Sequence, residues 1–231
     1  MREWAPPRRP WILAQTWCDL LFAHWPVPAA ALRSAVPAPL DLDLWEGSAW
    51  IGVVPFRMER IRPRGLFALP WLSATPEINV RTYVTFGGKR GIYFLSLHAS
   101  NPMVVSIARH FFHLRYQRAE MSVRSEGEMV HYASNGRGVE FRGSYGPSGD
   151  VAPPQPGTLE HWLTARYCFY SVQKGNVIRG EVDHPEWPLQ PATASIETNN
   201  MTAPFGIDLP GEAPLLHFSR RLDVVLWLPT R

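Results

Sequence analysis

The chain has 231 residues, of which 45% are hydrophobic and 19% are charged, a balance that is typical of a folded globular protein and excludes a disordered one. The formal net charge is only +3, and the basic residues are scattered, so we expect no nucleic-acid partner. No apolar stretch approaches the ~18 residues of a membrane-spanning helix, so we expect no membrane span. The length fits one domain that covers residues 1–231.

The first residues of the chain and its two cysteines bear on the cellular compartment of the protein. Met1–Pro10 is rich in arginine and proline and is not followed by an apolar segment with a small-residue cleavage site, so we expect no signal peptide. Cys18 and Cys168 lie far apart, and neither belongs to a CxxC pair. This pattern indicates reduced core cysteines in a cytoplasmic protein.

Prolines and glycines, 23 and 17 in number, divide the chain into short segments, which favours strands over long helices. Ala49–Phe56 is expected to form a buried strand. Pro76–Thr85 alternates between two kinds of side chain, which predicts a strand with two different faces. Gly87-Gly88 then predicts a turn into a strand at Gly91–Leu97, so the two strands should form a hairpin.

Two helices are expected after this hairpin. The first begins at Asn101-Pro102, a capping residue followed by a first-turn proline, and carries an apolar stripe. The second runs from about Thr158 to Tyr167. The proline- and glycine-rich stretch Gly143–Gly157 is expected to be a loop or a mobile lid. Four further strands are expected, at Cys168–Gln173, Val177–Val182, Ala192–Glu197 and Leu222–Leu228.

Six segments, taken as a set, resemble a known family. They are AHWPV (Ala23–Val27), WEGSAWIGVVPF (Trp45–Phe56), PEINVRTYV (Pro76–Val84), GIYFLSL (Gly91–Leu97), ARHFF (Ala108–Phe112) and ARYCFY (Ala165–Tyr170). Together they resemble the YqjF-like family, domain of unknown function 2071, which is similar in turn to acetoacetate decarboxylase. The resemblance implies a mainly β (α+β) fold: a closed, cone-like antiparallel β barrel with a few outer helices and a small buried cavity.

The resemblance to the decarboxylase also implies roles for individual positions. Glu77 falls at the enzyme's pocket glutamate, and Arg109 matches the arginine of its motif. Tyr116 and Gln117 stand where the enzyme has two lysines. One of those lysines forms a Schiff base with the substrate ketone, and the other lowers its pKa so that a neutral amine exists. A phenol and an amide can do neither.

Two lysines remain in the chain, Lys89 and Lys174. An unperturbed lysine titrates near ~10.4 and is almost fully protonated at pH 7. Lys89 follows a Gly-Gly pair and Lys174 lies in an expected turn, so both should be exposed, and we expect no Schiff-base decarboxylase activity. The chain also departs from its own family, because His98 replaces an expected aspartate, and Arg115 and Arg118 interrupt a segment that is usually apolar.

Glu77, Asn79 and Arg81 share one face of the expected strand. Alternation alone is equally compatible with a solvated outer face. The resemblance implies instead that this polar set faces the cavity, with Ile78, Val80 and Val84 toward the outer helices. Glu77 and Arg81 are separated by about 13 Å along a strand, so they would mark two ends of a polar wall. An interior arginine suits a carboxylate ligand, and a carboxyl group inside a largely apolar barrel should have a raised pKa.

The histidines of the sequence give only weak support for a metal-binding site. His98, His110 and His113 are near one another in sequence, but a metal site needs three or four converging ligands, and nothing supplies a fourth. We therefore expect no metal and no cofactor.

Three further residues have both a structural and a functional interpretation. His24 and His184 are flanked by tryptophan and proline, which favours structural hydrogen bonds, although a pocket role for His24 stays open. Arg166 is expected either to close one mouth of the barrel or to pack within it.

Two hypotheses of different classes follow. In the first, the barrel binds a small carbonyl or carboxylate compound without transforming it, and the candidate ligand-binding residues are Asn79, Arg81, Arg109 and His24. In the second, the chain is a lysine-independent lyase or isomerase that acts on a small keto or carboxylic acid. Glu77 would be its acid or base, and Tyr116 would help to orient the substrate.

Other function classes have less support. A third hypothesis is a structural domain that forms homo-oligomers. The sequence contains no GxSxG, GxGxxG or P-loop pattern, so a serine hydrolase, a dinucleotide-binding protein and a P-loop protein are not supported.

Overall fold

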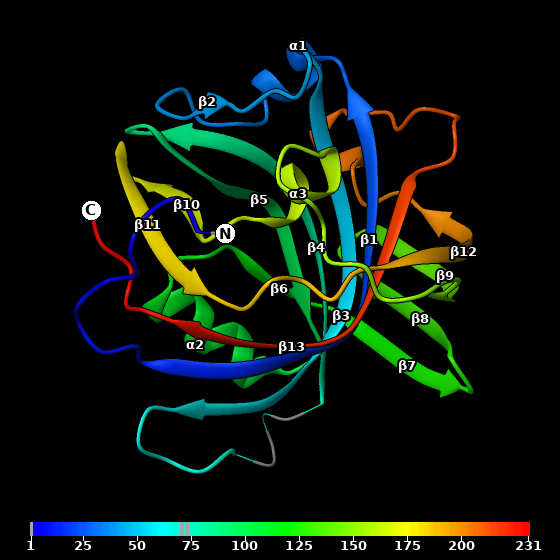
Figure 1. Cartoon of the computed structure of the whole chain (residues 1–231), viewed down its shortest axis with the longest axis horizontal. Coiled ribbons are helices and arrows are strands. Elements are labelled where there is room, and N and C mark those ends of the chain that lie inside the picture. Colours follow the sequence, from blue (N-terminus) through cyan, green and yellow to red (C-terminus); the bar gives the residue numbers. More distant parts are fainter. Residues whose placement is uncertain (1, 70–71, 73) are drawn as a thin grey trace.

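The computed structural model describes residues 2–69, 72 and 74–231. Within that part of the chain, seven strands pair in a closed ring in the order β1-β3-β4-β5-β10-β11-β13, and β13 pairs again with β1 (Figure 1). Their bounds are β1 Leu13–Val27, β3 Ala49–Pro63, β4 Thr75–Phe86, β5 Lys89–Ala99, β10 Cys168–Gln173, β11 Asn176–Asp183 and β13 Leu215–Leu226. The pairings are antiparallel except that β5 and β10 run parallel. The predicted mainly β class is confirmed, with this one parallel step in the ring.

The β4–β5 hairpin follows its local sequence signals. Gly87 and Gly88 both have positive φ, 57° and 73°, which glycine adopts without steric cost, so the chain reverses between the two strands. The expected strands at Ala49–Phe56 and Pro76–Thr85 are confirmed, and the first continues to Pro63 as part of β3.

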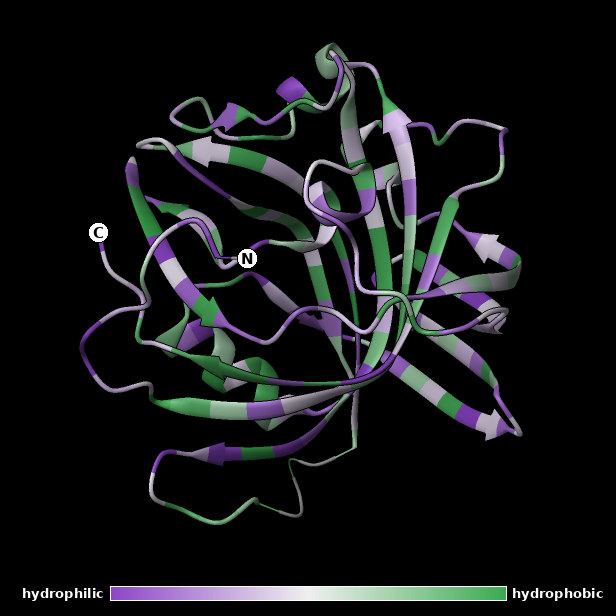
Figure 2. Ribbon diagram, viewed as in Figure 1, coloured by the Kyte–Doolittle hydropathy of each residue, from purple (hydrophilic) through white to green (hydrophobic). Residues whose placement is uncertain are grey.

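A second group of strands extends from the ring at β13. It consists of β12 Gln190–Asn199, β9 Val139–Pro147, β8 Met129–Gly136 and β7 Glu120–Glu126, on the right in Figure 1. β9 already includes Gly143–Pro147, so the expectation of a loop across Gly143–Gly157 is wrong for its first five residues. The ribbons in Figure 2 carry alternating hydrophobic and hydrophilic bands, which is the pattern of strands with one buried face.

This second group covers the outer face of β4. Ile78 and Val80 pack in one core cluster with Val130, Tyr132 and Phe141 of β8 and β9. The expectation that the apolar face of β4 lies toward outer helices is therefore wrong for these two residues, because a sheet, not a helix, covers them.

Short helices and two minor strands connect these elements. They are α1 Ala29–Arg33, α2 Pro102–Phe111, α3 Leu159–Thr164, the 3-10 helix η2 Ala203–Phe205, β2 Asp41–Leu42 and β6 Tyr116–Arg118. α2 begins as predicted, because the Asn101 side chain accepts a hydrogen bond from the Met103 amide at 2.9 Å. Val105 and Ala108 of α2 pack in one cluster with Leu97 of β5, which anchors the helix to this strand.

α3 ends earlier than predicted. Its last backbone carbonyls are bound by side chains, since Arg166 Nε donates to the Trp162 oxygen at 2.7 Å and Trp187 Nε1 donates to the Thr164 oxygen at 3.0 Å. These contacts replace the next helical turn. The chain leaves the helix at Ala165 and enters β10 at Cys168.

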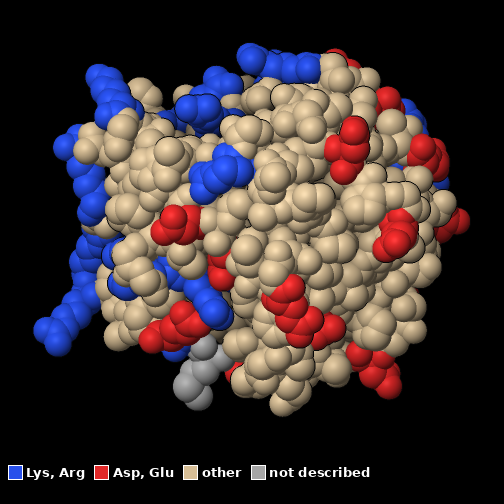
Figure 3. Space-filling view, turned by 90° about the horizontal axis from the view of Figure 1, so that it is seen from above, with Lys and Arg blue, Asp and Glu red and all other residues tan. Residues whose placement is uncertain are grey.

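The surface carries separated charges. In the view of Figure 3, lysine and arginine side chains gather along one edge, and acidic side chains spread over the opposite part of the face. In the described part of the chain, no helix has the length and apolar character needed to cross a membrane.

Candidate functional site

A cavity of about 90 Å³ lies inside the ring. Most of its wall is apolar, formed by residues such as Trp17, Phe56 and Phe94. A few polar side chains interrupt this wall, and small-molecule sites generally combine the two in this way. The polar lining residues are Gln15, Glu77, Asn79, Arg81, Tyr116, Thr164, Arg166 and His184.

β4 supplies three of these polar groups. Glu77, Asn79 and Arg81 are 3%, 4% and 6% exposed, and all three line the cavity. Successive side chains of a strand point to opposite faces, so the packing of Ile78 and Val80 against the second sheet directs this polar set inward. The three residues form a polar wall that runs along the inside of the ring.

Glu77 and Tyr116 form a buried pair at one end of this wall. The Tyr116 hydroxyl donates to Glu77 Oε2 at 2.6 Å. Burial raises the pKa of Glu77 to about 7, and hydrogen bonds from Tyr116 and Asn79 oppose this rise. The pKa of Tyr116 is raised well above its usual value by burial and by the nearby Glu77, so the phenol keeps its proton. Near neutral pH the pair can therefore hold or release one proton, through Glu77.

Arg81 stands at the other end of the wall. None of the described acidic residues forms an ion pair with it, and its buried Nε has no hydrogen-bond partner there. Its guanidinium carbon lies 4.9 Å from the centre of the Phe22 ring and 6.0 Å from that of Tyr83. Arg81 is thus a buried cation that contacts aromatic side chains, including the polar end of Tyr83, but no described carboxylate, and a bound anion would stabilise it.

Arg166 brings a second guanidinium to the same end of the cavity. Its Nη1 bonds Asp43 Oδ2 at 2.5 Å, while its buried Nη2 has no partner within the described chain. The guanidinium carbon lies 4.8 Å from the centre of the Tyr83 ring, so Arg81 and Arg166 flank the same aromatic side chain. Burial lowers the pKa of Arg166, and Asp43 opposes this effect.

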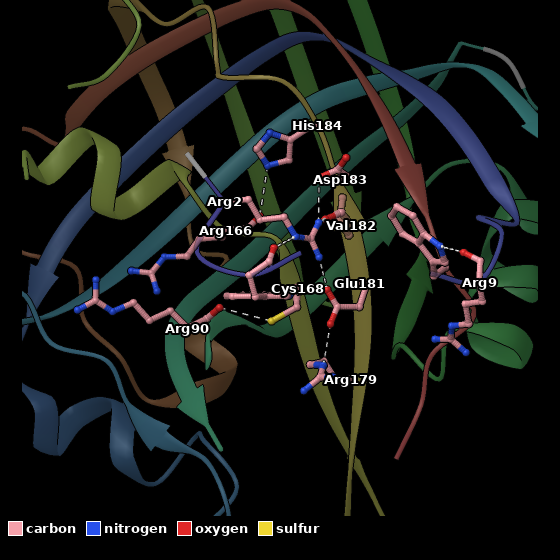
Figure 4. Close-up of polar contacts among 12 residues, drawn as sticks. Arg2, Arg9, Arg90, Arg166, Cys168, Arg179, Glu181, Val182, Asp183 and His184 are labelled. Atoms are coloured by element: carbon pink, nitrogen blue, oxygen red, sulfur yellow. Dashed lines mark hydrogen bonds and ion pairs between the residues drawn. The ribbon is translucent and has the colours of Figure 1, made fainter. Parts of the chain in front are cut away.

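His184 and the start of the chain close the wall beside Arg166 (Figure 4). His184 Nε2 lies 3.3 Å from the backbone oxygen of Arg166, and its ring stacks on Tyr167 with centroids 4.6 Å apart. The guanidinium of Arg2 covers Tyr167 at 5.3 Å and pairs with Glu181. The N-terminal segment thus packs behind the histidine, and burial lowers the pKa of His184, which favours its neutral form.

Two predicted ligand-binding residues lie elsewhere. His24 is fully buried and does not line the cavity; its Nε2 meets the Tyr83 hydroxyl at 2.7 Å, and burial lowers its pKa well below the usual value. Arg109 is exposed on α2, and its Nε donates to the backbone oxygen of Tyr116 at 2.7 Å. Arg109 therefore supports the cavity residue Tyr116 from behind, whereas His24 contacts Tyr83, which does not line the cavity.

In the sequence, the histidines weighed as metal ligands are His98, His110 and His113. His98 is buried between strands, whereas His110 lies on the exposed side of α2. Among the described residues, no group of three or more histidine, cysteine or acidic side chains is placed to hold a metal ion.

Sequence reasoning missed part of the cavity. It noted Arg166 as a mouth or packing residue but not its partner Asp43, and it did not consider Gln15 or Thr164. Cys168 also lines the cavity, where burial raises the pKa of its thiol to about 11. A thiol that stays protonated is a weak nucleophile, so Cys168 is expected to be inert.

Comparisons with known proteins identify the family to which the chain belongs. Residues 14–223 match the model of the DUF2071 family, which is described as an uncharacterized conserved protein. The chain belongs to this family. It is also 42% identical over 220 residues to the uncharacterized protein YqjF of Bacillus subtilis strain 168, covering 94% of this chain and 91% of that protein. The resemblance expected from the sequence is confirmed.

Solved structures extend the likeness to the fold. An acetoacetate decarboxylase-like enzyme from Sphingomonas wittichii RW1 matches with a TM-score of 0.64 and 11% identity, over 100% of this chain and 98% of that one. The enduracididine biosynthesis enzyme MppR complexed with pyruvate matches with a TM-score of 0.66 and 10% identity, over 99% and 91% of the two chains. The acetoacetate decarboxylase-like fold is therefore confirmed.

Proposed function

We propose that the ring binds a small carbonyl- or carboxylate-containing compound in its cavity, without Schiff-base chemistry. The observation that carries this proposal is Arg81, a buried cation on the cavity wall for which the described chain supplies no carboxylate. Arg166 adds an unpartnered N–H beside it. A ligand carboxylate would supply the missing negative charge and accept charge-assisted hydrogen bonds. The structural neighbour that was solved with pyruvate supports the same ligand class.

The positions of the lysines argue against a Schiff base. Lys174 is exposed in the turn before β11, and Lys89 lies at the start of β5 with its Nζ 5.2 Å from the centre of the Trp4 ring. Neither lines the cavity. Incubation with acetoacetate and borohydride should therefore give no lysine adduct by mass spectrometry, and an adduct on either lysine would contradict the proposal.

Ligand-induced stabilisation tests binding directly. Pyruvate and acetoacetate are added to wild type, Arg81→Gln and Arg124→Gln, the last removing an exposed arginine of β7 as a matched control. At a hundred times its Kd, a ligand should raise the free energy of unfolding by about 2.7 kcal/mol. Wild type and Arg124→Gln should respond equally, and Arg81→Gln should not respond. An equal response in all three proteins, or none in wild type, rejects the proposal.

A second candidate function is acid–base catalysis by Glu77, favoured by its pKa of about 7. The carboxylate would take a proton from the carbon beside a ketone. The C–H electron pair would form a C=C bond as the carbonyl π pair moves onto oxygen, which gives an enolate. Return of a proton or a solvent deuteron to carbon would restore the ketone.

Deuterium exchange tests this second candidate. In deuterated buffer, wild type should exchange the methyl protons of pyruvate, followed by NMR, with a rate that rises as the pH passes about 7. Glu77→Gln should exchange at the buffer rate. If wild type is no faster than buffer, binding remains and acid–base catalysis on this substrate is rejected.

A further inference from the structure

An apolar pocket of about 270 Å³ adjoins the cavity. It lies between the end of β3, the start of β1 and the inner side of α2, and its wall includes Ile61, Val104 and Ile107. Five residues line both spaces: Gln15, Met58, Leu114, Tyr116 and Leu226. The two spaces are therefore neighbours separated only by shared side chains. We call this second space the apolar annex.

The register of the strands places the annex and the arginines at opposite ends of the cavity. On β3, Phe56 pairs with Glu77 and Met58 with Thr75, so the annex residue Met58 lies beyond Glu77 as seen from Arg81. The order along the inside of the ring is cationic end, then the Glu77 pair, then apolar annex.

We propose that the ligand is an amphipathic carboxylic acid whose carboxylate binds at Arg81 and Arg166 and whose aliphatic tail occupies the annex. This inference rests on the proposed function and adds the class of ligand. An apolar recess is poorly hydrated, and an aliphatic tail that fills it is removed from water at the same time. Met58 is one of the shared wall residues, and its flexible side chain can adapt to a passing chain.

Affinity as a function of tail length tests the inference in wild type, without any variant. Kd is measured by calorimetry for octanoate, decanoate and dodecanoate, a series that ends with a tail long enough to pass Glu77, with 1-decanol as a probe that lacks the carboxylate. Burial of methylene groups predicts that Kd falls about tenfold for each two-carbon step. The alcohol should bind much more weakly than decanoate.

Two variants of α2 locate the tail. Ile107→Trp adds bulk inside the annex, whereas Ser106→Trp adds the same side chain on the exposed side of the helix. Ile107→Trp should bind octanoate with the same Kd as wild type but should not bind dodecanoate more tightly, whereas Ser106→Trp should keep the tighter binding of dodecanoate. Arg81→Gln should bind none of the acids.

The outcomes separate this inference from the proposed function. If octanoate binds in an Arg81-dependent manner but dodecanoate binds no tighter, the annex inference is wrong and the proposed function stands. If dodecanoate binds equally to wild type and Arg81→Gln, or Ile107→Trp keeps the tighter binding of dodecanoate, the inference is also overturned. If wild type binds none of the acids, both are overturned.

Discussion

Replacing Glu77 with glutamine should reveal the free-energy cost of ionising a carboxyl group inside the ring. The Tyr116 hydroxyl donates to Glu77, and no cation of the described chain forms an ion pair with it. Glutamine keeps the shape and an oxygen that can accept the Tyr116 hydrogen bond, but it cannot ionise. The two proteins should therefore differ mainly in the free energy of ionising this one group.

The size and sign of the effect follow from the pKa values. Glu77 titrates near 4.5 in an unfolded chain and about 7 in the folded protein. Between these values the unfolded chain binds fewer protons than the folded one, so this group's contribution to stability falls as the pH rises. The full contribution is present below about pH 4.5 and is lost above about pH 7. The stability lost is about 3 kcal/mol, because each unit of difference between the folded and the unfolded pKa corresponds to about 1.4 kcal/mol.

Urea unfolding of wild type and Glu77→Gln between pH 5 and pH 8 measures this difference. The variant should gain about 2–3 kcal/mol over wild type across that range. Buried histidines such as His24 and His184 have lowered pKa values and give the opposite trend, but they are common to both proteins and cancel. Glu120→Gln on the exposed surface should show no such change. A constant difference across pH, or a variant that is less stable at pH 8, would refute the reasoning.

Two further substitutions test the contacts around the cavity. Tyr116→Phe removes a hydrogen bond that lowers the pKa of Glu77, so the pKa of Glu77 should rise above 7. An NMR titration of labelled glutamate measures this pKa, and an unchanged value would contradict the Tyr116–Glu77 hydrogen bond. Asp43→Ala leaves the buried Arg166 without its carboxylate and should cost about 3–5 kcal/mol in urea unfolding, whereas a loss below ~1 kcal/mol would mean that solvent compensates the charge.

The elements that sequence analysis placed well have local signals. The β4–β5 hairpin depends on alternation and a Gly-Gly turn, and α2 depends on the Asn101 cap, so short stretches of sequence determine both. The strands β1, β7, β8 and β9 were missed. β7 is polar and largely exposed along most of its length, so its side chains carry no strong hydrophobic pattern, and it is defined by its pairing with β8.

The candidate site was predictable only where it lies on a patterned strand. Alternation identified the polar face of β4, but it left open whether that face pointed inward, and the resemblance supplied the direction. The Asp43–Arg166 pair joins residues 123 positions apart, and neither has a local motif. Contacts of that kind arise from the closure of the ring, which brings the segment after β2 beside the end of α3.

The tyrosine at position 116 changes the electrostatics of the cavity as well as its chemistry. A lysine there could pair with Glu77 as a cation, whereas the phenol only donates a hydrogen bond, so burial dominates and raises the pKa of Glu77 to about 7. Positive charge remains at Arg81 and Arg166, and a guanidinium is a poor nucleophile because it stays protonated. The cavity thus has a cationic end and a carboxyl group that is neutral below pH 7.

This arrangement predicts pH-dependent binding of anions. When Glu77 ionises, its negative charge opposes a bound carboxylate within the same low-dielectric cavity. The Kd of wild type for pyruvate should therefore increase as the pH rises from 6 to 8, and calorimetry at constant ionic strength measures it. In Glu77→Gln the Kd should stay constant over this range, because the amide at position 77 cannot ionise. If the variant shows the same pH dependence as wild type, a group other than Glu77 controls binding, and the assignment of Glu77 to the ligand cavity loses its main electrostatic support.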